Sequence, residues 1–394
     1  FTGINNEQFQ CIGETGMSFL LNEEQRQFSD SAQEFLSAKS PLSLQRQLRD
    51  TSSALGFEPS LWEEVIELGW TAAVFPVEEG GLAVGYKGMG AVFEAIGRHV
   101  AALPLLSSIV MGGEIILQAG TASQKQTWLP SLMTGQQRLA LAIDEQGRHD
   151  PRKIKTMATK TADGWLLNGD KWFVVDGLGA TCFVVVAKVE AASGATELGL
   201  FLVDNAWTGV KTHATKLADS RNYAQLSLVN VRVTEEMCLG VGAAAEKALH
   251  IALDKARICL AAEGLGLLKE AFDRTNAYLK ERIQFDVPIG SFQALQHRMA
   301  RLYTELQMLE SCVRAALSAI DSTQDDLPLL ASLAKARTSD LCEKLMNEAI
   351  QLHGGIGVTD EFDLGLIVKR ARVLQQTLGD GVFHRNRYAV LKGF

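Results

Sequence analysis

The chain has 394 residues, of which 47% are hydrophobic and 21% are charged, so we expect a soluble protein of two or three domains. Its formal charge of -8 argues against nucleic-acid binding by the whole protein, because such binding normally needs a basic surface. No run of about 18 apolar residues predicts a membrane span, and we expect a cytoplasmic protein that binds neither nucleic acid nor membranes.

Residues 1–16 lack the basic and apolar regions of a signal peptide, and Met17 begins a more typical start. We therefore expect an extension outside the fold at residues 1–16. The six cysteines lie far apart, without a CxxC pair or a histidine at metal-ligand spacing, which predicts structural thiols and no metal site.

From residue 17 to residue 135, apolar residues recur at helical spacing, for example at Phe28, Phe35 and Leu36. Asn22 followed by Gln25 predicts a capping box where the first helix begins. This block is expected to be a helical domain.

From residue 136 to residue 242, short β-rich runs such as "CFVVVAKV" and "AQLSLVNVRV" replace the helical spacing. "NGDK" (168–171) and "DGLG" (176–179) predict tight turns, because Asn-Gly and Asp-Gly tolerate positive φ. We expect a β-barrel or sandwich domain here.

From residue 243 to residue 394, helical spacing returns, beginning with a long stretch without proline. Later helices are expected over 292–317, 327–352 and 359–373, and long antiparallel helices of this kind form a four-helix bundle. The predicted fold class is therefore α+β, mostly α, with an N-terminal helical domain, a middle β-domain and a C-terminal bundle.

Two motifs in the bundle allow both a structural and a functional interpretation. "LHGGIG" (352–357) is either a helix C-cap or a site where the backbone comes close to a phosphate or ribose. Arg282 in "RIQFDVPIGSFQ" is either a solvated charge at a helix end or a guanidinium that holds a pyrophosphate.

The order of these blocks, with "GRHDP", "FQALQHR" and "QLHGGIG", resembles the acyl-CoA dehydrogenase family over the chain from Met17. The likeness is closest to the branch that includes the small subunit of pimeloyl-CoA dehydrogenase. It implies FAD held between the β-domain and the bundle, α,β-dehydrogenation of an acyl-CoA, and electron transfer to an electron-transfer flavoprotein. It also implies a homo-oligomer or a heteromer with a second acyl-CoA dehydrogenase subunit.

The same resemblance implies cofactor-binding residues that reach FAD across the subunit interface. They are Arg282, Phe285, Gln293, Gln351, Gly354 and Gly355. The chain departs from the family at Asp286, where a glycine is usual, and this departure concerns the turn beside Phe285.

A further departure lies in "IDEQGRHD" (143–150), which takes the position of the family's T-E-P-x-x-G-S-D segment beside the flavin. Ile143 replaces the threonine, so one side-chain donor to the flavin ring is missing. His149 replaces the serine, and it is either close to the ligand or a solvated or structural residue.

Both positions at which the family carries its catalytic base are vacant, because Leu378 and Ala256 occupy them. Glu263 is one candidate base: it lies on the same helix face as Ala256, and its apolar neighbours would raise the pKa of its carboxyl group. It could equally be a buried structural glutamate. Asp380 is the second candidate, or else a cap residue in a turn. In a third interpretation the chain has no base and completes the cofactor site of a heteromer.

Overall fold

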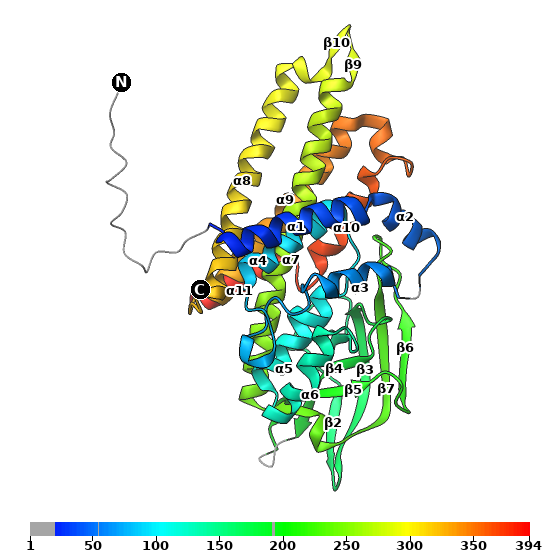
Figure 1. The fold of residues 1–394 in the computed structure, drawn as a ribbon, viewed down its shortest axis with the longest axis vertical. Coiled ribbons are helices and arrows are strands. Elements are labelled where there is room, and N and C mark those ends of the chain that lie inside the picture. Colours follow the sequence, from blue (N-terminus) through cyan, green and yellow to red (C-terminus); the bar gives the residue numbers. More distant parts are fainter. Residues whose placement is uncertain (1–19, 54, 191–193) are drawn as a thin grey trace, which may run out of the picture.

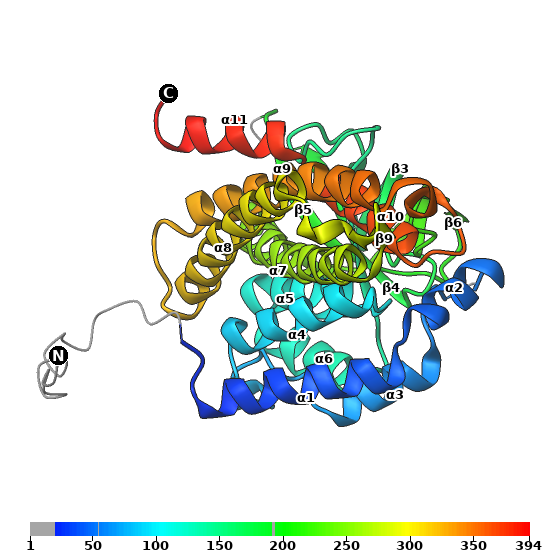
Figure 2. The same ribbon diagram turned by 90° about the horizontal axis from the view of Figure 1, so that it is seen from above.

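The computed structural model describes residues 20–53, 55–190 and 194–394, so the predicted extension at residues 1–16 lies outside the described residues. Figure 1 shows a sheet at one end of the molecule and two long helices that reach the other end. The N-terminal helices pack against the long helices, as the view from above shows (Figure 2).

The N-terminal part of the described chain is helical. Its elements are α1 (Glu23–Lys39), α2 (Leu42–Asp50), α3 (Pro59–Glu67), η1 (Val77–Glu79), α4 (Tyr86–His99), the π-helix η2 (Leu106–Gly113), α5 (Glu114–Ala119) and α6 (Ala122–Met133). The predicted capping box at the start of α1 is confirmed: Gln25 N–H donates to the Asn22 side chain at 2.8 Å, and Asn22 N–H donates to the Gln25 side chain at 3.1 Å.

The middle part forms a mixed sheet of eight strands among the described residues, in the order β6-β7-β3-β2-β4-β5-β8 with β1 beside β4. The strands are β1 (Leu139–Ala142), β2 (Met157–Thr161), β3 (Gly164–Val175), β4 (Cys182–Glu190), β5 (Thr196–Asp204), β6 (Val210–Ala214), β7 (Tyr223–Val233) and β8 (Cys238–Val241), with the 3-10 turn η3 (Glu235–Met237) before β8. Both faces of the central strand β4 are buried among apolar side chains. Along β4, Val184 and Val186 join the core shared with the helices, whereas Phe183 and Val185 join a second core within the β-domain.

One of the two predicted turns is wrong. "NGDK" lies inside β3, where the register with β7 is irregular between Leu167 and Gly169, as in a β-bulge. Gly169 is required there because an added Cβ would lie 2.4 Å from Thr156 Oγ1. "DGLG" does form a turn, in which Gly179 N–H donates to the Asp176 carbonyl at 3.2 Å.

The C-terminal part consists of α7 (Ala243–Glu281), α8 (Gln293–Asp321), α9 (Leu327–His353), α10 (Leu364–Gln376) and α11 (Gly381–Leu391). A short hairpin, β9 (Ile283–Gln284) and β10 (Val287–Pro288), follows α7, with the 3-10 turns η4 (Ile289–Ser291) and η5 (Gly354–Val358). The predicted helix over 359–373 begins only at Leu364, and residues 359–363 form turns and bends instead.

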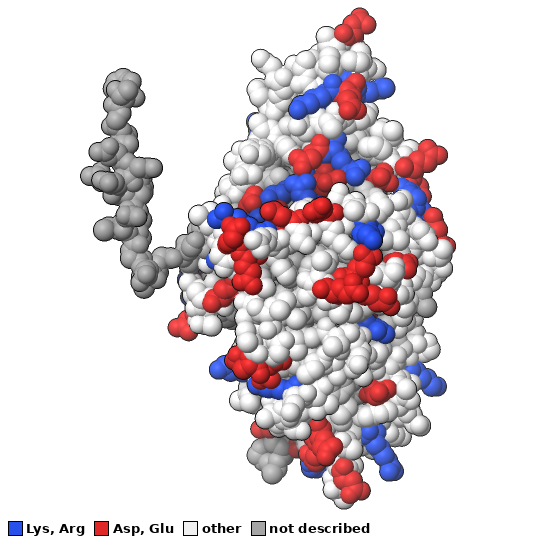
Figure 3. All heavy atoms as spheres, viewed as in Figure 1, with Lys and Arg blue, Asp and Glu red and all other residues white. Residues whose placement is uncertain are grey.

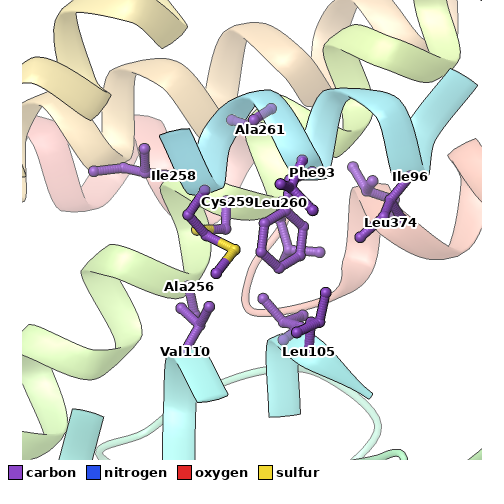
Figure 4. Packing of buried hydrophobic residues seen from close by; sticks show 14 of the residues in the cluster. Phe93, Ile96, Leu105, Val110, Ala256, Ile258, Cys259, Leu260, Ala261 and Leu374 are labelled. Atoms are coloured by element: carbon purple, nitrogen blue, oxygen red, sulfur yellow. The ribbon is translucent and has the colours of Figure 1, made fainter. Parts of the chain in front are cut away.

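Close packing of α4 on α7 joins the N-terminal helices to the bundle. A Cβ added at Gly97 would lie 2.0 Å from the Glu263 carbonyl oxygen, and one added at Gly266 would lie 1.9 Å from that of Glu94. Only glycine lets the two backbones approach so closely. Figure 4 shows the apolar side chains that fill the adjacent core, from α4, η2, α7 and α10.

Acidic and basic side chains are interspersed on the face drawn in Figure 3. None of the helices in the described ranges combines the length and the apolar character that a membrane span requires.

Candidate functional site

A cavity of about 1080 Å³ lies where the β-domain meets the C-terminal helices. Its walls include the loop after β1, the end of β3, and the segment that joins α10 to α11. The segment "IDEQGRHD" (143–150) contributes Ile143, Asp144 and residues 146–150, and "LQQTLGDGVFHR" (374–385) contributes residues 376–380, 382 and 383. The fold therefore brings together two segments that are far apart in the sequence.

A buried ion pair fixes the loop after β1. The Lys171 ammonium, which is fully buried, donates to Glu145 Oε1 at 2.6 Å and to the Ile143 carbonyl at 3.3 Å. Burial by itself would raise the pKa of Glu145, but Lys171 and two hydrogen bonds from Thr156 outweigh burial and lower it. The neighbouring Trp172 and Phe173 line the cavity, so the pair holds one wall in place.

Both ring nitrogens of His149 have hydrogen-bond partners within the protein. Its Nδ1 lies 2.9 Å and 3.0 Å from the two carboxylate oxygens of Asp144, and its Nε2 lies 3.1 Å from Arg257 Nη2. Because an arginine can only donate, Nε2 accepts and Nδ1–H donates to Asp144. Burial lowers the pKa of His149, Asp144 opposes this and Arg257 adds to it, so the ring is neutral. His149 thus joins the β-domain loop to α7 at the cavity wall.

The segment that carries Leu378 and Asp380 forms the opposite wall. Leu378 is buried, and its φ of 56° lies in the left-handed region, which residues with a side chain rarely adopt. Its carbonyl accepts hydrogen bonds from Arg257 Nε at 3.3 Å and from His384 Nε2 at 3.1 Å. Asp380 lines the cavity and also caps α11, because its Oδ1 accepts from the Phe383 N–H at 2.7 Å.

Glu263 lies away from this wall. It is 2% exposed and forms a bidentate ion pair with Arg370, with distances of 2.7 Å from Nε to Oε1 and 3.0 Å from Nη2 to Oε2. Arg370 also binds Asp219 at 2.9 Å. Burial by itself would raise the pKa of Glu263, but Arg370 and Arg221 outweigh it and lower the pKa. The geometry therefore argues against the role of base that helical spacing suggested, and the competing interpretation as a structural glutamate fits the observed partners.

Arg282, Phe285 and Gln293 lie at the far end of the bundle, where Figure 1 shows β9 and β10. Phe285 (φ 56°) and Asp286 (φ 62°) form the two-residue turn of this hairpin. Two successive positive φ values are typical of a type I′ turn, which aspartate tolerates, so the turn forms without the usual glycine. Phe285 is 86% exposed, its ring packs at 6.0 Å against that of the exposed Phe292, and the Arg282 side chain is exposed beside them.

Gln351, Gly354 and Gly355 lie at the same end of the bundle. Tyr278, one helical turn before Arg282, stacks on His353 with ring centroids 4.5 Å apart and donates to its carbonyl at 3.3 Å. An added Cβ at Gly354 or Gly355 would meet open space, so a ligand can approach this backbone. The six predicted cofactor residues are all exposed at this end of the bundle and do not belong to the cavity wall of the same chain.

Sequence reasoning missed Arg370, the aromatic pair Trp172 and Phe173, and Lys335, which donates to carbonyls at the end of α10 and to that of Gly379. The sequence around the two cations does not reveal their partners, whereas two adjacent aromatic residues in a β-run were a signal that could have been used. Among the described residues, no group of three or more His, Cys, Asp or Glu side chains could hold a metal ion.

Comparisons with known proteins agree with this arrangement. The sequence patterns of the acyl-CoA dehydrogenase N-terminal, middle and C-terminal domains match residues 22–136, 140–231 and 247–389. Mitochondrial isovaleryl-CoA dehydrogenase of Solanum tuberosum is 28% identical over 393 residues, which cover 97% of this chain and 93% of that protein.

Two solved structures share the fold over nearly the whole chain. A variant of the Tcur3481-Tcur3483 steroid ACAD is 30% identical with a TM-score of 0.83, and the match covers 95% of this chain and 98% of that one. The ChsE4-ChsE5 complex from Mycobacterium tuberculosis is 24% identical with a TM-score of 0.86, and that match covers 96% of this chain and 99% of the other. With three domain patterns in this order and a relative that is 30% identical over 95% of this chain, the chain belongs to the acyl-CoA dehydrogenase family of oxidoreductases.

Proposed function

We propose that the protein binds FAD, catalyses α,β-dehydrogenation of an acyl-CoA thioester and passes the electrons to an electron-transfer flavoprotein. The observation that carries this proposal is the cavity of about 1080 Å³ between the β-domain and the bundle. Its walls contain both segments that the family resemblance associates with the flavin and the substrate. Its size suits a ligand larger than a simple metabolite.

The described residues fit FAD in two respects. Trp172 and Phe173 offer apolar faces in the cavity, which suit a planar ring system. At the far end of the bundle, the exposed Arg282 and the open backbone at Gly354 suit the phosphates of a cofactor held mainly by a neighbouring subunit. FAD, when bound, would supply the acceptor for the hydride that leaves the β-carbon.

The chain's own residues would position the acyl chain, exclude water and accept the α-proton. Of the two bases predicted from the sequence, Asp380 is the one that lines the cavity. One of its oxygens accepts from the Phe383 N–H, and a proton acceptor has to come within hydrogen-bond reach of the α-carbon. We propose Asp380 as the base of this chain and Glu263 as a structural residue.

A purified sample tests this function directly. We expect the chain to carry a flavin spectrum and expect anaerobic addition of an acyl-CoA to bleach it. The panel should contain straight-chain, branched, dicarboxyl and steroid side-chain thioesters, because the lining does not select among them. If the protein binds FAD and no member of the panel bleaches it, this chain alone is not a dehydrogenase.

A second function is favoured by a specific observation. Each carboxylate of the described residues that line the cavity already has a donor: Asp144 binds His149, Asp150 binds Arg152, and Asp380 binds the Phe383 N–H. We propose, as the alternative, that the chain completes the cofactor site of a catalytic partner through Arg282 and its neighbours. The ChsE4-ChsE5 complex, made of two different proteins, supports such an arrangement.

The two functions differ in one measurement. If bleaching appears only after a second acyl-CoA dehydrogenase subunit is added, the partner supplies the base and the alternative holds. If the chain alone is bleached at a rate that the second subunit leaves unchanged, the alternative is wrong.

A further inference from the structure

Lys335 of α9 is fully buried beneath the segment that joins α10 to α11. Its Nζ donates to the carbonyl oxygens of Leu374 at 3.0 Å, Gln375 at 3.1 Å and Gly379 at 2.9 Å, with Ser339 Oγ further away at 3.4 Å. An ammonium group has three N–H donors, so each donor meets one carbonyl. The carbonyls at the end of a helix lack intrahelical partners, and the lysine supplies them for α10.

The segment that Lys335 holds has an unusual backbone. Leu378 has a φ of 56° and Gly379 one of 107°, and a leucine adopts the left-handed region only where its surroundings impose it. Arg257 of α7 and His384 of α11 both donate to the Leu378 carbonyl. Donors from three helices therefore bind four carbonyls at the end of α10 and in the segment after it, and Lys335 makes three of these five bonds.

We propose that Lys335 is a positioning residue of the cavity: by binding three carbonyls, it imposes the backbone conformation in which residues 377–380 form the cavity wall. The segment bears Asp380 on its cavity side and ends where Asp380 caps α11. The effect of Lys335 on the backbone of residues 377–380 follows from the contacts alone. The effect of Lys335 on catalysis rests on the proposed function, because it depends on the position of Asp380.

The charged and titratable groups that interact with Lys335 come from four helices and from the loop after β1. They are Arg257 of α7, Cys342 of α9, Arg370 of α10, Asp380 before α11, His384 of α11 and His149 of the loop. Burial lowers the pKa of Lys335 to about 7; Arg257 and Arg370 add to this, and Cys342 and Asp380 oppose it. When the segment opens and the lysine reaches water, its pKa returns toward about 10.4.

Because the pKa of Lys335 differs between the closed and the open segment, closure of the segment depends on pH, and we call this dependence its pH signature. Between about pH 7 and pH 10 the open state binds more protons than the closed state. Closure of the segment should therefore strengthen as the pH rises above about 7, by up to about tenfold per pH unit, and should not change with pH below that value.

Hydrogen exchange of the full chain, followed by mass spectrometry from pH 6 to pH 9, tests the proposal without flavin or substrate. The reporting amides are those of Thr377, Gly379 and His384, which are hydrogen-bonded within or next to the segment. For Lys335→Met we expect exchange of residues 374–384, corrected for the chemical rate, to be roughly 10- to 100-fold faster, because three buried carbonyls lose their donor. The pH signature should also disappear.

Two further variants keep the experiment decisive. Lys335→Gln retains two N–H donors and cannot titrate, so we expect an intermediate exchange rate and no pH signature. This variant tests the proposal even if the methionine variant does not fold. Lys369→Met, at a half-exposed lysine of α10, is the matched control and should exchange like the wild type. Exchange of strands β4 and β5 should be the same in all four proteins.

Unchanged exchange of residues 374–384 in both Lys335 variants, or faster exchange of the whole chain to the same extent, would overturn the proposal. In flavin-loaded protein we further expect Lys335→Gln to lower the limiting rate of bleaching more than the affinity for acyl-CoA. If exchange responds as expected but the wild type is never bleached, the positioning role stands and the proposed dehydrogenase activity fails.

Discussion

Replacement of Glu263 by glutamine separates a structural glutamate from a catalytic base. Glu263 and Arg370 are 2% and 4% exposed and form two direct hydrogen bonds, at 2.7 Å and 3.0 Å. Breaking a buried ion pair by removing one partner costs about 3–5 kcal/mol, because the other charge stays buried. Arg370 keeps Asp219 at 2.9 Å, so we expect about 3 kcal/mol, the lower end of that range.

The assay combines urea unfolding with anaerobic bleaching of flavin-loaded protein. We expect the unfolding midpoint of Glu263→Gln to fall, and the bleaching rate per folded, flavin-loaded chain to stay within a factor of a few. Glu246→Gln is the matched control, since it removes an exposed carboxylate from the same helix. The reasoning is refuted if Glu263→Gln unfolds like the wild type but is bleached about 10²–10⁴-fold more slowly, which is the contribution expected of a general base.

Three other outcomes are expected. Arg282→Ala should lower the FAD content of the purified protein without lowering its stability in urea, whereas Arg301→Ala, at another exposed arginine, should leave the FAD content unchanged. Asp380→Asn retains a helix-capping side chain, so stability should change by less than about 1 kcal/mol, while bleaching by an acyl-CoA should slow by about 10²–10⁴-fold; equal rates would exclude Asp380 as the base. Lys171 lowers the pKa of Glu145 in the folded protein, so the stability from this pair is complete above about pH 4.3 and is lost as the pH falls through the lower folded value. In acid unfolding followed by circular dichroism, the stability of Glu145→Gln should therefore fall less steeply with decreasing pH than that of the wild type.

The sequence predicted what depends on local pattern. Helical spacing and β-rich runs predicted the three parts of the fold, and Asn22 with Gln25 predicted the start of α1. "NGDK" failed because Asn-Gly is favourable both in a turn and in a bulge, and the neighbouring strand decides between them.

The candidate site could be predicted only in part, since it depends on long-range partners. The apolar neighbours of Glu263 correctly predicted that it is buried, but its partner Arg370 lies on another helix 107 positions later. No local pattern could show whether that carboxylate meets an arginine or a cavity. The same limit applies to Lys335, whose acceptors are backbone carbonyls and leave no trace in the sequence.

Arg257, which follows the vacant position at Ala256, donates through Nε to the carbonyl of Leu378, the other vacant position, at 3.3 Å. Neither an alanine nor a leucine side chain can accept a proton. Arg257 can only donate, and His149 Nε2 already accepts a hydrogen bond from Arg257 Nη2 at 3.1 Å, so neither side chain is free to accept a proton from an acyl chain. We therefore infer that any proton acceptor reaches the α-carbon from elsewhere, either from Asp380 on the same wall or from a second subunit.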